Sequence, residues 1–167
     1  MGPPGPARRR PAGRGSADYL QDWRLIQEIQ APATHLAYKA MLELRPNIGP
    51  ELGFTDHIDK VLRPEGYRLV GFFVKEDIYA VAVAGFRVIN YLAWGHSMYC
   101  DDLSTRFEHR KQGYAGQLMD WMIDEAKSLH LDEFHLDSGL GEDRADAHRL
   151  YFNKKLRIAD FHFSRRV

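Results

Sequence analysis

The stretch HRKQGYAGQL, residues 109–118, combines residue types that could bind a phosphate group. Two basic residues and a glutamine precede a pair of glycines, and an amphipathic segment follows directly. The first turn of a helix presents N–H groups without partners and a partial positive charge, so a phosphate can bind there without further side chains. Gly113 can turn the backbone into the helix with a positive φ and let a ligand approach closely.

The spacing of this stretch differs from two common phosphate-binding motifs. It is neither G-x-x-x-x-G-K-[ST] nor the G-x-G-x-x-G of dinucleotide-binding folds. Arg110 and Lys111 would add positive charge for a pyrophosphate, and Ala115 and Gly116 keep the surface low. A glycine turn before a core helix, flanked by solvated basic residues, explains the same letters without any ligand. The surrounding elements must therefore decide between the two interpretations.

Two adjacent carboxylates, Asp101 and Asp102, lie just upstream in the segment CDDLST. Successive residues of a strand face opposite sides, so both point into one site only if a bulge intervenes. One of them could bind or deprotonate a cationic amine, directly or through water. A structural hydrogen bond at the end of a strand is the alternative. We favour a functional role and take Asp102 before Asp101, although nothing in the pattern separates them.

Hydrophobic periodicity predicts the elements that must position these residues. Strands are predicted over residues 22–30, 67–75, 78–89, 96–105, 133–138 and 159–163. Helices are predicted over residues 32–44, 55–62, 113–129 and 143–155, with Thr55 as the cap of the second. A tight turn at residues 76–77 is expected between the second and third strands. The order β-α-α-β-β-β-α-β-α-β indicates a mixed α/β domain, with an antiparallel meander followed by a right-handed β-α-β crossover.

The bulk composition is typical of a globular protein. The chain has 167 residues, 44% of them apolar and 28% charged, which suits a single domain with its own core. No apolar run approaches the roughly 18 residues of a membrane span, and the N-terminus lacks the apolar stretch of a secretory signal. Cys100 is the single cysteine, so no disulfide framework forms within one chain. We therefore expect a cytoplasmic setting and no membrane partner.

The charge is spread unevenly along the chain. Residues 1–17 are rich in Pro, Gly and Arg and hold four arginines and no acid, so we predict a disordered basic tail followed by one domain over residues 18–167. An arm that contacts RNA or a membrane is the less favoured alternative. Outside the tail, 19 basic residues face 23 acidic ones, which argues against a nucleic-acid partner. The eight histidines show no ligand spacing, so no metal site is predicted.

The segment RKQGYA, Arg110–Ala115, resembles the [QR]-x-x-G-x-[GA] signature of the GNAT superfamily of N-acetyltransferases. It also has the position of that signature, between the strand ending in DDLST and a long amphipathic helix. Downstream, DAHRLYF resembles a second landmark of the superfamily, a helix with a tyrosine near its end. The resemblance covers about residues 23–163 and implies a GNAT-like fold.

The resemblance implies acetyl-CoA as the cofactor, with CoA as product and no metal. The N–H groups from Gln112 to Gly116 would hold the pyrophosphate, and the backbone from Leu103 to Thr105 would pair with the pantetheine arm where two strands splay. The residues expected to bind the cofactor are Leu103, Ser104, Thr105, Arg110, Lys111, Gln112, Gly113, Tyr114, Ala115 and Gly116.

The resemblance also implies catalytic roles. Tyr151 would protonate the leaving sulfur, and a backbone N–H near Leu103 would stabilise the oxyanion. The alternative for Tyr151 is a half-buried aromatic residue of the kind expected for Phe152. CDDLST resembles the acidic pair of the diamine acetyltransferases of this superfamily. Asp137, at the end of its strand, could add negative charge at the opening of the same site, although capping the following loop is the favoured role.

Other residues receive structural interpretations first. Cys100 is expected to be buried, and His148 and His162 are expected to pack or lie on the surface. Tyr91 and Trp94 could line an acceptor pocket or simply pack. Three further residues are weak candidates for shaping the acceptor site: Glu51, Phe54 and Asp56.

The chain departs from the superfamily pattern after Tyr151. It reads NKKL where many members read NGF, so the end of that helix is expected to differ. Only one further strand is predicted, and a seventh strand common in the superfamily is missing. The sheet edge left there could pair with a second copy of the chain, which leaves a homodimer open.

Together these features predict an acetyl-CoA-dependent N-acetyltransferase that acts by direct attack in a ternary complex. A small cationic amine, such as a polyamine or an aminoglycoside-like compound, is the favoured acceptor because of the acidic pair and the negative domain. A protein N-terminus or lysine is the first alternative. A CoA-binding module without catalysis is the second, and Tyr151 argues against it because a pure sensor needs no acid for the leaving group.

Overall fold

The computed structural model describes residues 23–167, and the predicted tail over residues 1–17 lies outside this part of the chain. The strands of the sheet are β1 (Arg24–Glu28), β2 (Arg68–Val74), β3 (Ala82–Tyr91), β4 (Gly95–Thr105) and β5 (Phe134–Leu136). The α-helices of the described part are α1 (Tyr38–Leu44), α2 (Glu51–His57), α3 (Tyr114–Ser128) and α4 (Ala145–Asn153). Short 3-10 turns precede α1, α3 and α4.

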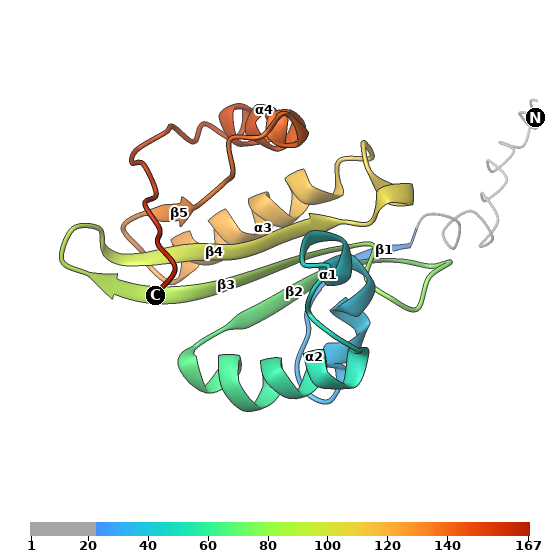
Figure 1. The fold of residues 1–167 in the computed structure, drawn as a ribbon. Coiled ribbons are helices and arrows are strands. Elements are labelled where there is room, and N and C mark those ends of the chain that lie inside the picture. The colour runs from blue at the N-terminus through green and yellow to red at the C-terminus, as the bar shows by residue number, and fades with distance from the viewer. Residues whose placement is uncertain (1–22) are drawn as a thin grey trace, which may run out of the picture.

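The five strands form one mixed sheet in the order β1-β2-β3-β4-β5 (Figure 1). The first three pairings are antiparallel, and β4 pairs with β5 in parallel. The predicted meander and the β-α-β crossover through α3 are therefore confirmed. β2 is buried almost throughout because it lies inside the sheet with helices over both faces.

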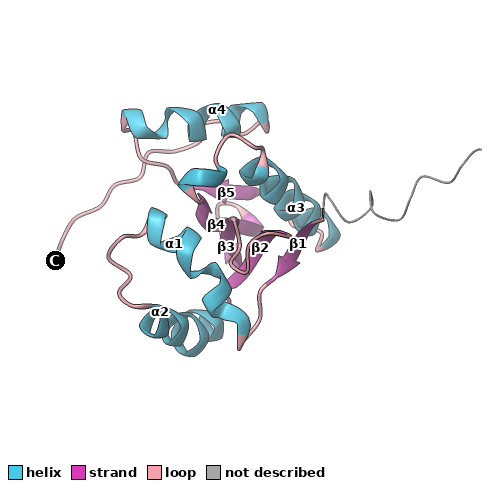
Figure 2. Ribbon diagram, turned by 90° about the vertical axis from the view of Figure 1, so that its right-hand side faces the viewer, coloured by secondary structure: helices cyan, strands magenta, loops and turns pink. Residues whose placement is uncertain are grey.

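The helices divide into two layers. α1 and α2 lie over one face of the sheet, and α3 and α4 belong to the other (Figure 2). α3 buries its apolar stripe against the sheet, with Leu118, Met119 and Met122 fully covered. On the opposite face, α1 contributes Ala40 and Met41 to a second core. We call the side of the sheet that α3 covers the α3 face, and the side that α1 covers the α1 face.

Two local predictions about the first half of the chain are wrong. The second helix starts at Glu51 with Pro50 before it, so Thr55 lies inside the helix, where its hydroxyl donates to the carbonyl oxygen of Glu51 instead of capping an end. The helical path continues through a π-helical turn, Ile58–Leu62. The connection from β2 to β3 spans residues 75–81 and is longer than the predicted tight turn, because Asp77 folds it by accepting the N–H of Tyr79.

The predicted last strand over residues 159–163 is also wrong. Residues 154–167 follow α4 without regular structure, and residues 157–167 are exposed throughout. β5 offers only three residues for pairing, and Phe161 and Phe163 find no surface to bury them. The C-terminal segment instead passes in front of β4 and β3 (Figure 1). Within residues 23–167, no helix has the length and apolarity needed to cross a membrane.

Candidate active site

A β-bulge places both carboxylates of CDDLST on one face of the sheet. Gly85 of β3 pairs with Asp102, whereas its neighbour Phe86 pairs with Cys100, so Asp101 is the extra residue on β4. Cys100 lies in the core of the α3 face, while the partners of Asp101 and Asp102 lie on the α1 face. From the sequence, Asp101 and Asp102 could face one site only if a bulge lay between them, and the structure contains that bulge.

Asp102 is held by partners at both of its oxygens. Arg45, directly after α1, contacts Oδ1 through Nε at 2.9 Å and Nη2 at 2.8 Å, and its Nη2 also donates to the carbonyl oxygen of Asp101 at 3.2 Å. The hydroxyl of Tyr67 donates to Oδ2 at 2.9 Å. Burial and the carboxylates of the bulge raise the pKa of Tyr67 well above its usual value, so it remains a donor. Both oxygens of Asp102 therefore have partners, which fix the position of its carboxylate.

Asp101 is the less satisfied carboxylate of the two. Its Oδ2 is buried and makes no hydrogen bond in the described part of the chain, although Nε of Arg87 lies 3.4 Å away in ion-pair range. Burial raises the pKa of Asp101 to about 6, against the opposing effect of Arg87 and with a smaller contribution from Asp102. The side chain keeps 25% of its surface exposed. A carboxylate of this kind can exchange a proton near neutral pH.

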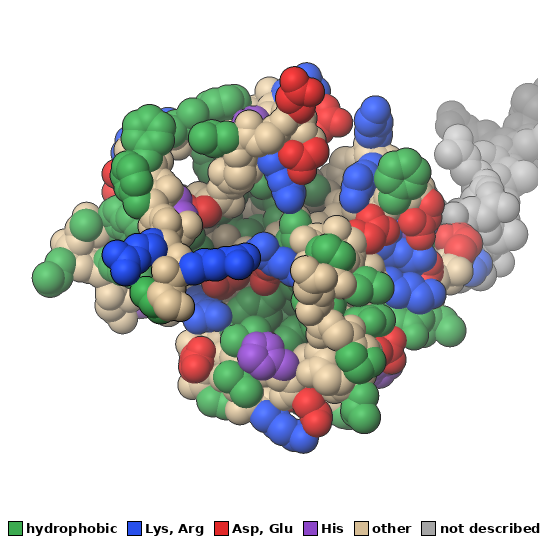
Figure 3. Space-filling model, viewed as in Figure 1, with side chains coloured by type: hydrophobic (Ala, Val, Ile, Leu, Met, Phe, Trp, Pro, Cys, Tyr) green, Lys and Arg blue, Asp and Glu red, His purple; other side chains and the backbone are tan. Residues whose placement is uncertain are grey.

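The approach of Tyr67 to the bulge depends on Gly85. A Cβ at Gly85 would meet the Tyr67 hydroxyl at 1.7 Å, so only glycine leaves room for this ring. Figure 3 shows a hollow in the middle of the α1 face. Acidic side chains lie at the bottom of the hollow, and Lys and Arg side chains lie across its opening. The site thus combines a buried aromatic support with charges of both signs.

β4 and β5 diverge next to the bulge. Their pairing ends with Cys100 and Leu136, and β4 continues to Thr105 without a partner on that side. The Oγ1 of Thr105 is buried and has no hydrogen-bond partner within residues 23–167. This unpaired backbone, with one unsatisfied hydroxyl, fits an extended chain that carries its own polar groups, as the pantetheine arm of CoA does.

Tyr151 reaches the point of divergence from the α3 face. It packs against the core on that face and forms a hydrogen bond with Ser138, just beyond β5. Burial, and then the nearby Cys100, raise the pKa of Tyr151, so the phenol keeps its proton at neutral pH. The neighbouring Phe152, expected to be a core or half-buried aromatic residue, is 55% exposed and therefore lies outside the core.

The glycine turn has the backbone shape expected of a phosphate cradle. Gly113 precedes α3 with φ +83°, and Lys111 also has a positive φ of 61°. Only the Gln117 side chain lies within reach of a Cβ at Gly113, at 3.9 Å, so the concave side is open. The α3 N-terminus begins at Tyr114, and its free N–H groups face this turn. The residues present therefore fit a pyrophosphate.

The side chains of the turn are partly engaged elsewhere. Arg110 donates from Nη2 to Glu43 of α1 at 3.0 Å and from Nε to the carbonyl oxygen of Thr105 at 3.1 Å. Tyr114 is buried and donates to Gln112 at 2.9 Å. The hydroxyl of Ser104 donates to the carbonyl oxygen of Ala40 at 2.6 Å. Leu103 packs toward the α3 face, and Gly116 of α3 faces Leu150 of α4.

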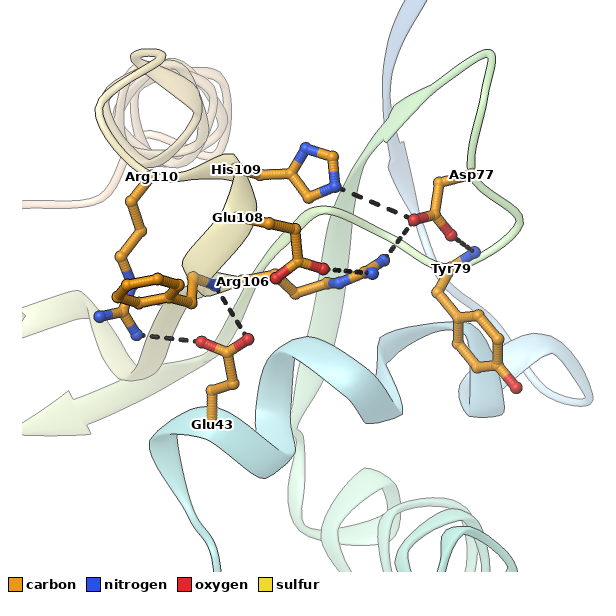
Figure 4. A network of polar contacts seen from close by, with 8 residues as sticks. Glu43, Asp77, Tyr79, Arg106, Glu108, His109 and Arg110 are labelled. Atoms are coloured by element: carbon orange, nitrogen blue, oxygen red, sulfur yellow. Dashed lines mark hydrogen bonds and ion pairs between the residues drawn. The ribbon is translucent and has the colours of Figure 1, made fainter.

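A network of ion pairs fastens the turn to the rest of the domain (Figure 4). Arg106 is nearly buried and donates to Asp77 at 2.6 Å and to Glu108 at 2.5 Å. Glu43 accepts the N–H of Phe107 at 2.9 Å in addition to Arg110. α1 therefore contacts both sides of the site, through Glu43 at the turn and through Arg45, one residue past its end, at the bulge.

The remaining candidates separate into two groups. Asp137 forms a hydrogen bond with Tyr99, and its Oδ2 lies 3.0 Å from Nδ1 of His162, which places it on the α1 face beside the bulge. His148 contacts Ser138 at 3.1 Å, close to Tyr151. The others have structural roles: Cys100 is buried, Phe54 is in the core, Glu51 accepts from Tyr79, and Asp56 pairs with Lys60.

Sequence reasoning missed Arg45, Tyr67, Arg87 and Glu43. Arg45 is separated from Asp102 by 57 positions and Tyr67 by 35, so no local pattern connects them. A weak signal existed for Tyr67, since a glycine inside a predicted strand marks a close approach of another group. Gly85 is such a glycine, although the sequence does not say which residue approaches it.

Comparison with protein families identifies one match. The family described as Acetyltransferase (GNAT) matches residues 24–156, which covers most of the chain. A comparison with curated protein sequences finds no match.

Solved structures with the same fold include several acetyltransferases. A ribosomal-protein-alanine N-acetyltransferase from Brucella melitensis biovar Abortus 2308 is 20% identical with a TM-score of 0.68, covering 87% of this chain and 100% of that chain. An aminoglycoside N-acetyltransferase in complex with CoA is 11% identical with a TM-score of 0.72, covering 87% and 95%. A glucosamine-6-phosphate N-acetyltransferase from Arabidopsis thaliana is 10% identical with a TM-score of 0.64, covering 86% and 98%. At these identities the likeness shows the fold.

Proposed function

Because the chain belongs to the acetyltransferase (GNAT) family, we propose that it transfers the acetyl group of acetyl-CoA to the primary amine of a small cationic molecule, by direct attack in a ternary complex. Acetyl-CoA supplies the acetyl group as a thioester. One observation carries the proposal: β4 continues past the end of β5, with Asp101 on one face of this opening and Tyr151 reaching it from the other.

The amine must lose a proton before it can attack. Asp101, with its pKa raised to about 6, is ionised at neutral pH and can accept a proton from an ammonium group, directly or through a water molecule. Asp102 is saturated by Arg45 and Tyr67, so it positions the bulge and does not take the proton. This difference supports Asp101, rather than Asp102, as the proton acceptor.

The sulfur must gain a proton as the carbon–sulfur bond breaks. The phenol of Tyr151, protonated at neutral pH, donates it and is later reprotonated from solvent. The unpaired backbone near Leu103 offers N–H groups for the oxyanion and for the pantetheine arm. The turn ending at Gly113 holds the pyrophosphate through the N–H groups of residues 112–116.

A protein amine is the second candidate acceptor. The similar structures include an enzyme named for a ribosomal-protein alanine and others named for small amines. The acceptor site proposed here lies in a hollow of the α1 face that is crossed by basic side chains (Figure 3), which supports a small molecule over an extended peptide.

A hydroxyl deletion tests the proposal. Tyr151→Phe should lower kcat about 100-fold or more, the usual contribution of a general acid, while the Kd for CoA stays unchanged. CoA release from acetyl-CoA and an amine panel gives kcat, and a thermal shift with CoA gives binding. Tyr79→Phe is the matched control, since its hydroxyl contacts Glu51 away from the opening. Equal kcat values for the two variants would remove Tyr151 as the acid.

A further inference from the structure

The acceptor site holds fewer free negative charges than its two adjacent aspartates suggest. Asp102 is already neutralised by Arg45, whose guanidinium contacts one oxygen twice, and Tyr67 occupies the other. A second guanidinium, Arg87, lies 3.4 Å from Asp101 and also faces Glu65 at 3.9 Å. A second ammonium on the acceptor would therefore meet two resident cations. The bulge suits an acceptor with one positive charge.

Aromatic side chains continue the site along the same face. Tyr99 precedes Asp101 by two positions on β4, and its register partner His135 on β5 precedes Asp137, the residue directly after β5, by two positions. Alternation along a strand places residues two apart on one face, so each strand presents a ring followed by a carboxylate. The hydrogen bond between Tyr99 and Asp137 confirms this arrangement across the two strands.

The row of rings extends into the β3–β4 hairpin. Trp94 stacks on His135 with ring centroids 4.1 Å apart and planes 20° apart. Tyr91 lies 4.9 Å from Trp94, and its side chain is 53% exposed. This hairpin extends beyond the rest of the sheet (Figure 1). We call Tyr91, Trp94, His135 and Tyr99 the aromatic row.

A planar apolar group gains most from such a surface. Offset or tilted ring pairs stabilise association beyond the area that they bury, and stacking orients the ligand. Asp137 is engaged by the hydroxyl of Tyr99, whereas Oδ2 of Asp101 makes no hydrogen bond in the described part of the chain. With Asp101 at its end, the row matches a molecule whose single amine is attached to an uncharged ring. Rings also attract cations, so a diamine must be compared directly.

We propose that the acceptor is a primary monoamine carried on an uncharged aromatic body, with the amine at Asp101 and the body on the aromatic row. This inference rests on the proposed function. It narrows the acceptor class from small cationic amines in general to those with one charge and an aromatic group, and it excludes polyamines as the preferred substrates.

The experiment compares matched amines with the full chain at saturating acetyl-CoA. 2-Phenylethylamine, 2-cyclohexylethylamine and 1,4-diaminobutane separate the aromatic ring from apolar bulk and from a second charge. We expect kcat/KM for phenylethylamine to exceed that for diaminobutane about tenfold or more, with the cyclohexyl compound between them. A preference for diaminobutane, or for a lysine peptide included in the panel, overturns the inference and leaves the proposed function standing.

Variants in the hairpin give the second readout. Tyr91→Ala should raise KM for phenylethylamine about fivefold while kcat and the KM for n-propylamine stay unchanged. Leu92→Ala is the matched control, because Leu92 is the neighbouring residue and is fully exposed. Trp94→Ala should act more strongly, and Tyr91→Ala keeps the test valid if that variant does not fold. Equal effects on both amines overturn the inference, and no CoA release with any amine overturns the proposed function together with it.

Discussion

The glycine turn before α3 and the bulge at Asp101 lie close to each other along the chain, but they are constructed differently. The turn consists of consecutive residues 110–116, and its shape comes from positive φ angles at Lys111 and Gly113. The bulge is held by three side chains: Arg45 directly after α1, Tyr67 directly before β2 and Arg87 in the middle of β3. The first site is local backbone, and the second is long-range packing. Substitutions in the turn should therefore change the affinity for CoA, whereas substitutions at the bulge should change kcat.

The largest effect is expected for Asp101→Asn. Loss of the proton acceptor should lower kcat about 100-fold or more without changing the Kd for CoA. In the unchanged enzyme, kcat/KM should rise with pH through about 6, where Asp101 ionises, and this limb should be absent in the variant. Rate–pH profiles and CoA titrations check both statements. A CoA affinity that falls with kcat would show that the bulge and the turn are not separate.

In the unchanged enzyme, Asp101 should lower stability over the same pH range in which it raises activity. Asp101→Asn should remove this loss of stability. The folded-state pKa of Asp101 lies above its unfolded value near 3.9, so its contribution to stability is complete at low pH and is lost as pH rises to about 6. Asp101→Asn should therefore unfold at an equal or higher temperature at pH 7. Thermal unfolding at pH 4.5 and pH 7 measures the difference.

Gly85→Ala should have an intermediate effect that links the bulge to the core. The added Cβ would overlap the Tyr67 hydroxyl and move a fully buried ring, which costs about 1–3 kcal/mol of unfolding free energy for overpacking. Displacement of Tyr67 also removes a donor from Asp102, so kcat should fall as well. Denaturant unfolding gives the first quantity. Double substitution with Tyr67→Phe should not add to the loss of kcat if both act through Asp102.

Gly113→Ala should have the smallest effect on stability and a selective effect on CoA. A non-glycine residue at φ +83° costs roughly 1–2 kcal/mol. Gly49→Ala is the matched control, because φ there is +77° and no atom lies within 4 Å of the added Cβ. The two variants should lose similar stability, and only Gly113→Ala should weaken CoA binding. Equal CoA affinities would remove the turn from the cofactor site.

This contrast explains which features were predictable from the sequence. The turn, α3 and the strand order up to α4 depend on short patterns of glycine and apolar residues, and these predictions are confirmed. The orientation of Asp101 and Asp102 depends on the bulge opposite Gly85, which no pattern in CDDLST reveals. Residues 159–163 have the alternation of a strand, but alternation forms no sheet without an edge long enough to pair with. Thr55 was misplaced because α2 begins at Glu51, four residues before it.

The position of Cys100 has a practical consequence for every assay described above. It is the only thiol of the chain, it is 4% exposed, and burial raises its pKa to about 12, ahead of smaller effects of Asp102 and Asp101. Since the thiolate is the reactive form, a thiol-specific dye should report released CoA with no signal from the folded enzyme. When CoA is omitted, the rate at which the dye labels Cys100 should report the rate of global opening, because labelling then requires the sheet and α3 to separate.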